Sequence, residues 1–154
     1  LAWGERACSS AGGIFVSPEY PADMGAIFRI TADPSTNMVR QYLAGFFEAV
    51  DVERFVAARN AAHERLTCGP NEHVTLVDVR DMKIQPQEIV QAFGAVLAGP
   101  RYRSRKLAFV FSQSLARMQL MRASQGRDAR MFTDIKEAEA WLLTEDDAEG
   151  SIAA

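Results

Sequence analysis

Residues 73–82, HVTLVDVRDM, decide how the rest of this chain folds. Val74, Leu76, Val77 and Val79 are aliphatic, and the charged residues gather at the carboxyl end of the stretch. A nearly continuous aliphatic run of this length is typical of a strand that is buried on both faces of a parallel sheet. The stretch therefore predicts a central strand that carries its polar side chains to the edge of the sheet.

The same cycle of apolar run, polar turn and amphipathic helix recurs along the chain. Strands are expected at residues 26–31, 38–47, 73–82, 107–111 and 129–132, and helices at 51–66, 85–98, 115–124 and 134–143. The order is β-β-α-β-α-β-α-β-α, and strand–helix–strand crossovers at this spacing imply that the later strands pair in parallel. We therefore predict an α/β domain with a mixed sheet of about five strands and with helices packed on the sheet.

Residues 38–50, MVRQYLAGFFEAV, fit two alternatives. They can extend the next helix toward its amino end, or they can form a second strand that pairs back on residues 26–31 as a hairpin. The aromatic residues and Gly45 favour the strand, because aromatic side chains are enriched in strands and glycine weakens a helix interior. We choose the strand, and Asp51 is then expected to cap the helix that follows.

The composition describes one ordinary globular domain. The chain has 154 residues, 48% of them hydrophobic, and a net charge of −3, which argues against a nucleic-acid-binding protein. No apolar run approaches the roughly 20 residues that cross a bilayer. Cys8 and Cys68 form no disulfide framework and fit a reducing cytoplasm. We expect a loosely ordered extension at residues 1–23, a domain at 24–145 and a frayed acidic tail at 146–154.

Three segments resemble the SpoIIAA-like group of the STAS and SEC14 families. They are LVDVRDM with the helix that begins at QPQE, RKLAFVFSQSLARMQLMR, and RMFTDIKEAEAWL. The resemblance extends over residues 28–143, and its element order matches the order derived above. It implies a SpoIIAA-like (STAS-type) fold in a group of mostly unassigned function. In the wider STAS families the domain binds other proteins, and in some members nucleotides or lipids.

One departure from the family affects the function that the resemblance implies. STAS-type anti-sigma-factor antagonists carry a phosphorylatable Ser or Thr where the strand matching LVDVRDM meets its helix. Here that junction, residues 82–87, reads MKIQPQ and contains no hydroxyl. The phosphate switch of the family therefore does not transfer to this chain.

Two sets of polar residues are expected to meet at the carboxyl edge of the sheet, where open α/β folds bind ligands. Asp78, Arg80 and Asp81 end the central strand, and Ser112, Ser114 and Arg117 follow the strand at residues 107–111. Free N–H groups at the start of a helix attract anions, so the set predicts an edge for a small anion or nucleotide. The alternative is structural, with Arg80 paired to a neighbouring aspartate and a serine capping the helix.

The sequence contains no recognisable catalytic or metal-binding pattern. His63 is expected on a helix surface and His73 at an edge or turn, and neither belongs to a nucleophile motif or to a paired metal-ligand spacing. We therefore expect no catalysis, no metal and no cofactor.

Two functional hypotheses follow from these residues and from the resemblance. The leading one is a non-enzymatic, cytoplasmic regulatory domain that binds a protein partner or a second copy of itself, together with a small anion. The alternative is a Sec14-like carrier of a small apolar or lipid ligand, because helices rich in Met and Phe can open around one. Neither hypothesis involves nucleic acid or a membrane span.

Overall fold

The computed structural model describes residues 25–112, 119, 121–124 and 129–145. The expected extension at residues 1–23 and the expected tail at 146–154 lie outside the described part of the chain, as do Ser114 and Arg117.

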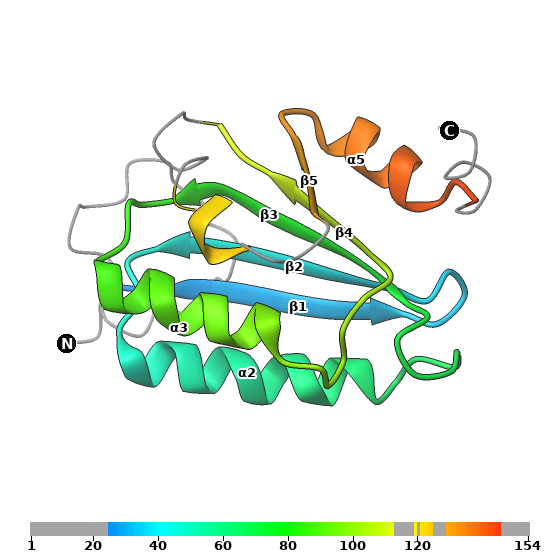
Figure 1. Ribbon diagram of the computed structural model, residues 1–154, viewed down its shortest axis with the longest axis horizontal. Helices are drawn as coiled ribbons and strands as arrows, with labels where there is room; N and C mark the ends of the chain where they lie inside the picture. Colours follow the sequence, from blue (N-terminus) through cyan, green and yellow to red (C-terminus); the bar gives the residue numbers. More distant parts are fainter. Residues whose placement is uncertain (1–24, 113–118, 120, 125–128, 146–154) are drawn as a thin grey trace, which may run out of the picture.

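The described residues form one sheet covered by helices (Figure 1). The elements are β1 (Ile27–Asp33), β2 (Met38–Gly45), α2 (Ala49–His63), β3 (Val74–Met82), α3 (Gln87–Ala98), β4 (Lys106–Val110), β5 (Ala129–Phe132) and α5 (Ile135–Leu142). The sheet has five strands in the order β1-β2-β3-β4-β5, which is also their order along the described chain. The predicted α/β architecture is confirmed.

β1 and β2 form an antiparallel hairpin, as we predicted in preference to a longer helix. The backbone N–H of Thr36 donates to the carbonyl oxygen of Asp33 over 3.3 Å and closes the turn. Asn37 then takes the left-handed conformation, with φ of 52°, which Asn tolerates better than most residues. The local turn chemistry therefore decides this element, since helix and strand propensities in the following residues are nearly balanced.

The strands from β2 to β5 are parallel neighbours. Crossovers between parallel strands are right-handed, and these strands advance in one direction across the sheet, so successive crossover helices lie on the same face. α2 and α3 accordingly run side by side along one face (Figure 1). α5 follows the last strand and packs on β3, β4 and β5 from the other face.

Two hydrophobic cores lie on opposite faces of the sheet. The core beneath α2 and α3 buries Leu43, Phe47, Val52, Phe55, Val77, Val79, Ile89, Leu107 and Phe109. The core beneath α5 buries Met38, Val74, Leu76, Ala108, Val110, Ala138 and Leu142. Successive residues of a strand point to opposite faces, so β3 supplies both cores. This explains why Val74, Leu76, Val77 and Val79 make the central strand aliphatic on both of its faces.

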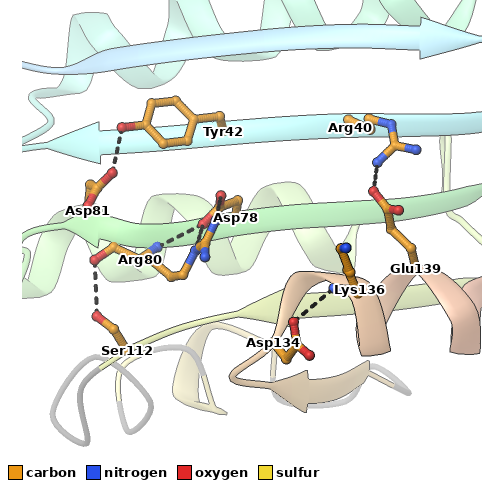
Figure 2. Close-up of polar contacts among 9 residues, drawn as sticks. All are labelled: Arg40, Tyr42, Asp78, Arg80, Asp81, Ser112, Asp134, Lys136 and Glu139. Atoms are coloured by element: carbon orange, nitrogen blue, oxygen red, sulfur yellow. Dashed lines mark hydrogen bonds and ion pairs between the residues drawn. The ribbon is translucent and has the colours of Figure 1, made fainter. Parts of the chain in front are cut away.

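The two acidic caps differ from each other. α2 begins at Ala49 with Glu48 at the N-cap, so the prediction that Asp51 occupies the cap is wrong. Asp51 instead lies in the first turn, where its carboxylate accepts the backbone N–H of Glu48 over 2.9 Å, as the inner member of a capping box does. Asp134 caps α5 as expected and accepts the backbone N–H of Lys136 over 3.1 Å (Figure 2).

α2, with 15 residues, is the longest helix in the described part of the chain. None of the helices described there combines the length and the apolar character that a bilayer crossing needs.

Candidate functional site

At the carboxyl edge of the sheet, Arg80 is held by Asp78 from the same strand. The guanidinium Nε donates to Oδ1 over 2.9 Å and Nη2 donates to Oδ2 over 2.8 Å, which makes a bidentate ion pair (Figure 2). The hydrogen bond to Asp78 raises the pKa of Arg80. The carboxylate therefore neutralises the positive charge that a bound anion would use.

Asp81 and Ser112 also have partners at this edge. The hydroxyl of Tyr42 donates to Oδ2 of Asp81 over 2.7 Å, and burial together with this carboxylate raises the pKa of Tyr42 to about 12. Oγ of Ser112 donates to the backbone carbonyl of Arg80 over 3.1 Å (Figure 2).

The structure thus brings four of the predicted site residues together, and each of them is engaged within the fold. The pairing of Arg80 with Asp78 is the one that the structural alternative proposed, whereas Asp81 accepts from Tyr42 and Ser112 donates to the carbonyl of Arg80. The full anion edge, which includes two residues outside the described chain, stays a prediction.

A cavity of about 100 Å³ lies on the other face of the sheet, beneath α2 and α3. Protein interiors contain few voids larger than a water molecule, so a space of this size is notable. Its walls are mainly apolar and include Leu43, Val77, Val79, Leu107 and Phe109 from the strands and Phe55, Val90, Phe93 and Val96 from the helices. Phe93 and Val96 belong to the predicted buried stripe of α3, yet they are only partly buried, and both line this cavity.

Two buried polar side chains line the cavity without a hydrogen-bond partner among the described residues. Gln41 on β2 is 7% exposed and Thr75 on β3 is 5% exposed. They lie on adjacent strands, since Gln41 is opposite Val77, two residues beyond Thr75. Burying an amide or a hydroxyl without a partner costs about 1–3 kcal/mol. Polar groups left open in an apolar pocket are those with which a ligand is oriented.

Several polar residues of the cavity gather at the amino end of β3. On the face of β3 that lines the cavity, the residue nearest the amino end is the polar Thr75. The apolar Val77 and Val79 follow toward the carboxyl edge. Near the carboxyl end of α2, Arg59 lines the cavity, and Tyr102 lines it from the loop before β4. The cavity is therefore polar at the amino end of β3 and apolar along its middle, while Lys83, Gln85 and Gln119 line its opposite end.

Tyr102 has a backbone conformation that is rare for a bulky residue, with φ of 58°. Its ring stacks on His63 with the centroids 4.7 Å apart, and its hydroxyl donates to Glu64 over 3.0 Å. Nη2 of Arg59 donates to its carbonyl oxygen over 3.4 Å. These contacts with the end of α2 hold the strained backbone and place the ring beside the polar end of the cavity.

His63 and His73 form a buried pair, so the expectation of a helix-surface His63 is wrong. The side chains are 6% and 3% exposed, and their Nε2 atoms lie 3.1 Å apart. Nδ1 of His63 is 2.7 Å from the carbonyl oxygen of Arg59, which only accepts; Nδ1 therefore carries the proton, and Nε2 accepts from His73. Burial lowers the pKa of His63. Within the described ranges, no cluster of three metal-ligating side chains includes this pair.

Gln85 closes the opposite end of the cavity, and the sequence did not predict its role. Its side-chain oxygen accepts the backbone N–H of Phe47 over 2.9 Å, and its amide nitrogen donates to the carbonyl oxygens of Gly45, over 2.9 Å, and Lys83. The side chain of Gln119 bonds the backbone N–H and carbonyl of Gln85 over 2.9 and 2.8 Å. The one sequence signal was the MKIQPQ junction, which contains no hydroxyl.

The arrangement of strands and helices is shared with a solved structure. No family model matches the chain, and no curated protein matches it. The chain resembles the crystal structure of an uncharacterized protein from the DUF3478 family of Shewanella loihica PV-4, with a TM-score of 0.58 and 13% sequence identity. The match covers 77% of this chain and 94% of that chain, which has a SpoIIAA-like fold. This chain has a SpoIIAA-like fold.

The SpoIIAA-like fold was the one that the three resembling segments implied, and that prediction is confirmed. In this SpoIIAA-like domain the first strand pair is antiparallel and the other pairs are parallel, as the mixed-sheet prediction required. At 13% identity the likeness concerns the fold. A shared fold does not determine the function, which depends on the residues of the cavity and of the carboxyl edge.

Proposed function

We propose that this SpoIIAA-like domain is a non-enzymatic binding protein that holds a small, largely apolar molecule in the cavity beneath α2 and α3. The observation that carries the proposal is the pair Gln41 and Thr75, two buried polar side chains that face an apolar cavity without partners among the described residues. A ligand with one polar end would satisfy them. An amide and a hydroxyl are neutral near pH 7, which suits recognition better than proton transfer.

The size of the cavity bounds the ligand. A dry cavity on the order of 150 Å³ admits benzene, so the space of about 100 Å³ fits an apolar group no larger than one ring. A longer ligand would have to displace α3, whose inward-facing Phe93 and Val96 are only half buried. The proposal therefore favours a small molecule over a phospholipid.

Filling the cavity tests the proposal. Val77→Phe puts a ring into the space, and we expect native mass spectrometry to find a small molecule bound to the wild type and absent from the variant. Leu76→Met, on the same strand but facing the other core, is the matched control and should keep the ligand. Overpacking costs about 1–3 kcal/mol, so the melting temperature of each variant is measured alongside. Equal ligand occupancy in wild type and Val77→Phe would overturn the proposal.

A protein partner is the second candidate function, favoured by exposed apolar side chains at the carboxyl edge. Phe46, Val50 and Ile84 are 38%, 52% and 45% exposed. The bond from the N–H of Lys83 to the carbonyl of Gly45, 3.2 Å, joins the two connections that carry Phe46 and Ile84. Apolar surface of this kind at one edge is typical of an interaction site.

Chemical cross-linking tests whether the carboxyl edge binds a partner, with the surface at Leu143 as the comparison. A defined cross-linked complex in native extract should be lost in the double variant Phe46→Ser/Ile84→Ser. It should persist in Leu143→Ser, since Leu143 is 54% exposed but lies just after α5. A complex that survives the double variant would exclude this edge as the interface.

A further inference from the structure

The charges around the cavity all have one sign. Among the described residues that line it, three are cationic, Arg59, Lys83 and Arg103, and none is Asp or Glu. A pocket with low-dielectric walls concentrates the potential of such charges and raises the local concentration of an oppositely charged ligand. In a protein whose net charge is −3, the described charged residues that line the cavity are thus all positive.

Part of the positive charge lies at the end of the cavity that Thr75 lines. Arg59 lies one turn before His63 on α2 and contacts the carbonyl of Tyr102, so its guanidinium is on the same side as Thr75. The guanidinium contributes its charge whatever hydrogen bonds it makes within the fold. Lys83 lies at the other end, close to Gln85.

The two unpartnered side chains can both donate a hydrogen bond. Gln41 carries two N–H donors and Thr75 one O–H donor, and both are more than nine-tenths buried. Hydrogen bonds to a carboxylate are about twice as strong as those between neutral groups. A carboxylate can accept from the amide of Gln41 and the hydroxyl of Thr75 at once through its two oxygens, whereas a methyl group accepts from neither.

We infer that the ligand is a small amphipathic monocarboxylate, with its apolar body along Val77, Val79 and Phe109 and its carboxylate against Gln41 and Thr75 near Arg59. The inference rests on the proposed function, since it names the ligand class of the same cavity. The walls exclude a multiply charged anion such as a nucleotide, because most of the cavity surface is apolar.

Calorimetric titration with benzoate and with benzyl alcohol tests the inference. The two probes share one ring and differ in charge. We expect benzoate to bind the wild type at least about tenfold more tightly than benzyl alcohol. Arg59→Met, which keeps the aliphatic stem, should remove most of that preference, and Arg59→Lys should retain part of it. Arg65→Met, an exposed arginine just beyond α2, should leave the preference unchanged.

The outcomes separate the inference from the proposed function. If benzyl alcohol binds as tightly as benzoate, or if Arg59→Met keeps the preference, the carboxylate assignment is wrong while the cavity remains a binding site. If neither probe binds the wild type, both the ligand class and the proposed function fail. Binding of benzoate that survives Val77→Phe would place the anion outside the cavity and would also overturn the inference.

Discussion

The side-chain oxygen of Gln85 accepts the backbone N–H of Phe47 over 2.9 Å and thereby joins the connection after β2 to the connection after β3. The MKIQPQ junction that contains Gln85 has no hydroxyl side chain. Here the junction is occupied by a buried amide whose hydrogen bonds are all made within the fold. The position has a structural role in this chain.

The Gln85 contacts predict a large loss of stability on truncation. Gln85→Ala leaves the N–H of Phe47 and the carbonyl of Gly45 without their partner, at about 1–3 kcal/mol each. We expect the free energy of unfolding in urea to fall by about 2–4 kcal/mol. Gln87→Ala, an exposed glutamine two residues on, should stay within about 0.5 kcal/mol of wild type. Similar small losses in the two variants would contradict the role assigned to Gln85.

Replacing Gln41 is expected to raise the stability, because its buried amide has no partner among the described residues. Gln41→Leu replaces an unpartnered buried amide with an apolar side chain of similar size, so we expect the free energy of unfolding to rise by about 1–2 kcal/mol. The same substitution should weaken binding of the cavity ligand. Gln91→Leu, on the exposed side of α3, is the control and should change neither quantity much. A destabilised Gln41→Leu would mean that the amide has a partner in the folded protein.

The buried histidine pair predicts a pH dependence. The pKa of His63 is lowered by burial from its usual 6.5, so the unfolded chain binds the proton first as the pH falls. Stability therefore decreases as the pH drops below about 6.5, by at most about 1.4 kcal/mol per pH unit for one proton. It levels off once the folded state also binds the proton.

Urea unfolding between pH 5 and 8 measures this dependence. His63→Gln removes the titrating group and should flatten the curve in this range. Asp33, whose pKa is lowered by hydrogen bonds from Ser35, titrates below its usual 3.8 and does not contribute there. An unchanged slope in His63→Gln would assign the pH dependence to another group.

Tyr42 predicts a spectroscopic signal at the carboxyl edge. Its pKa is raised to about 12 by burial first and by Asp81 second, while Asp78 contributes least. Asp81→Asn should therefore lower the pKa of Tyr42 toward its usual 10.0, though not fully, because burial remains. Asp78→Asn should lower it by less. Ultraviolet titration of the tyrosinate measures both, and equal shifts would contradict the hydrogen bond to Asp81.

Local patterns predicted most of the fold. The aliphatic run of β3, the turn residues before β2 and the Asp134 cap each act through near neighbours in the chain, which a sequence displays directly. The burial of His63 depends instead on Tyr102, about forty residues away and in a left-handed conformation that its residue type does not indicate.

The candidate site could be predicted only in part, because some of its contacts join residues that are far apart in the sequence. Asp78 and Arg80 are two residues apart on one strand, so their meeting follows from the period of a strand. Asp81 reaches Tyr42 near an irregularity in the β2–β3 register, and such an irregularity has no signature here. The cavity depends on how far two helices stand from a sheet, and an apolar residue that lines a space looks the same in a sequence as one that fills it.

The agreement between strand order and chain order has a consequence for folding speed. Each described strand pairs with the strand made immediately before it, so every sheet contact spans a single hairpin or a single crossover. Each new strand pairing therefore closes only one segment of chain and loses little loop entropy. The relative contact order stays low for a mostly parallel sheet. During synthesis the amino end leaves the ribosome first, so the hairpin of β1 and β2 can form early. β3, β4 and β5 can then pair with the growing sheet one after another.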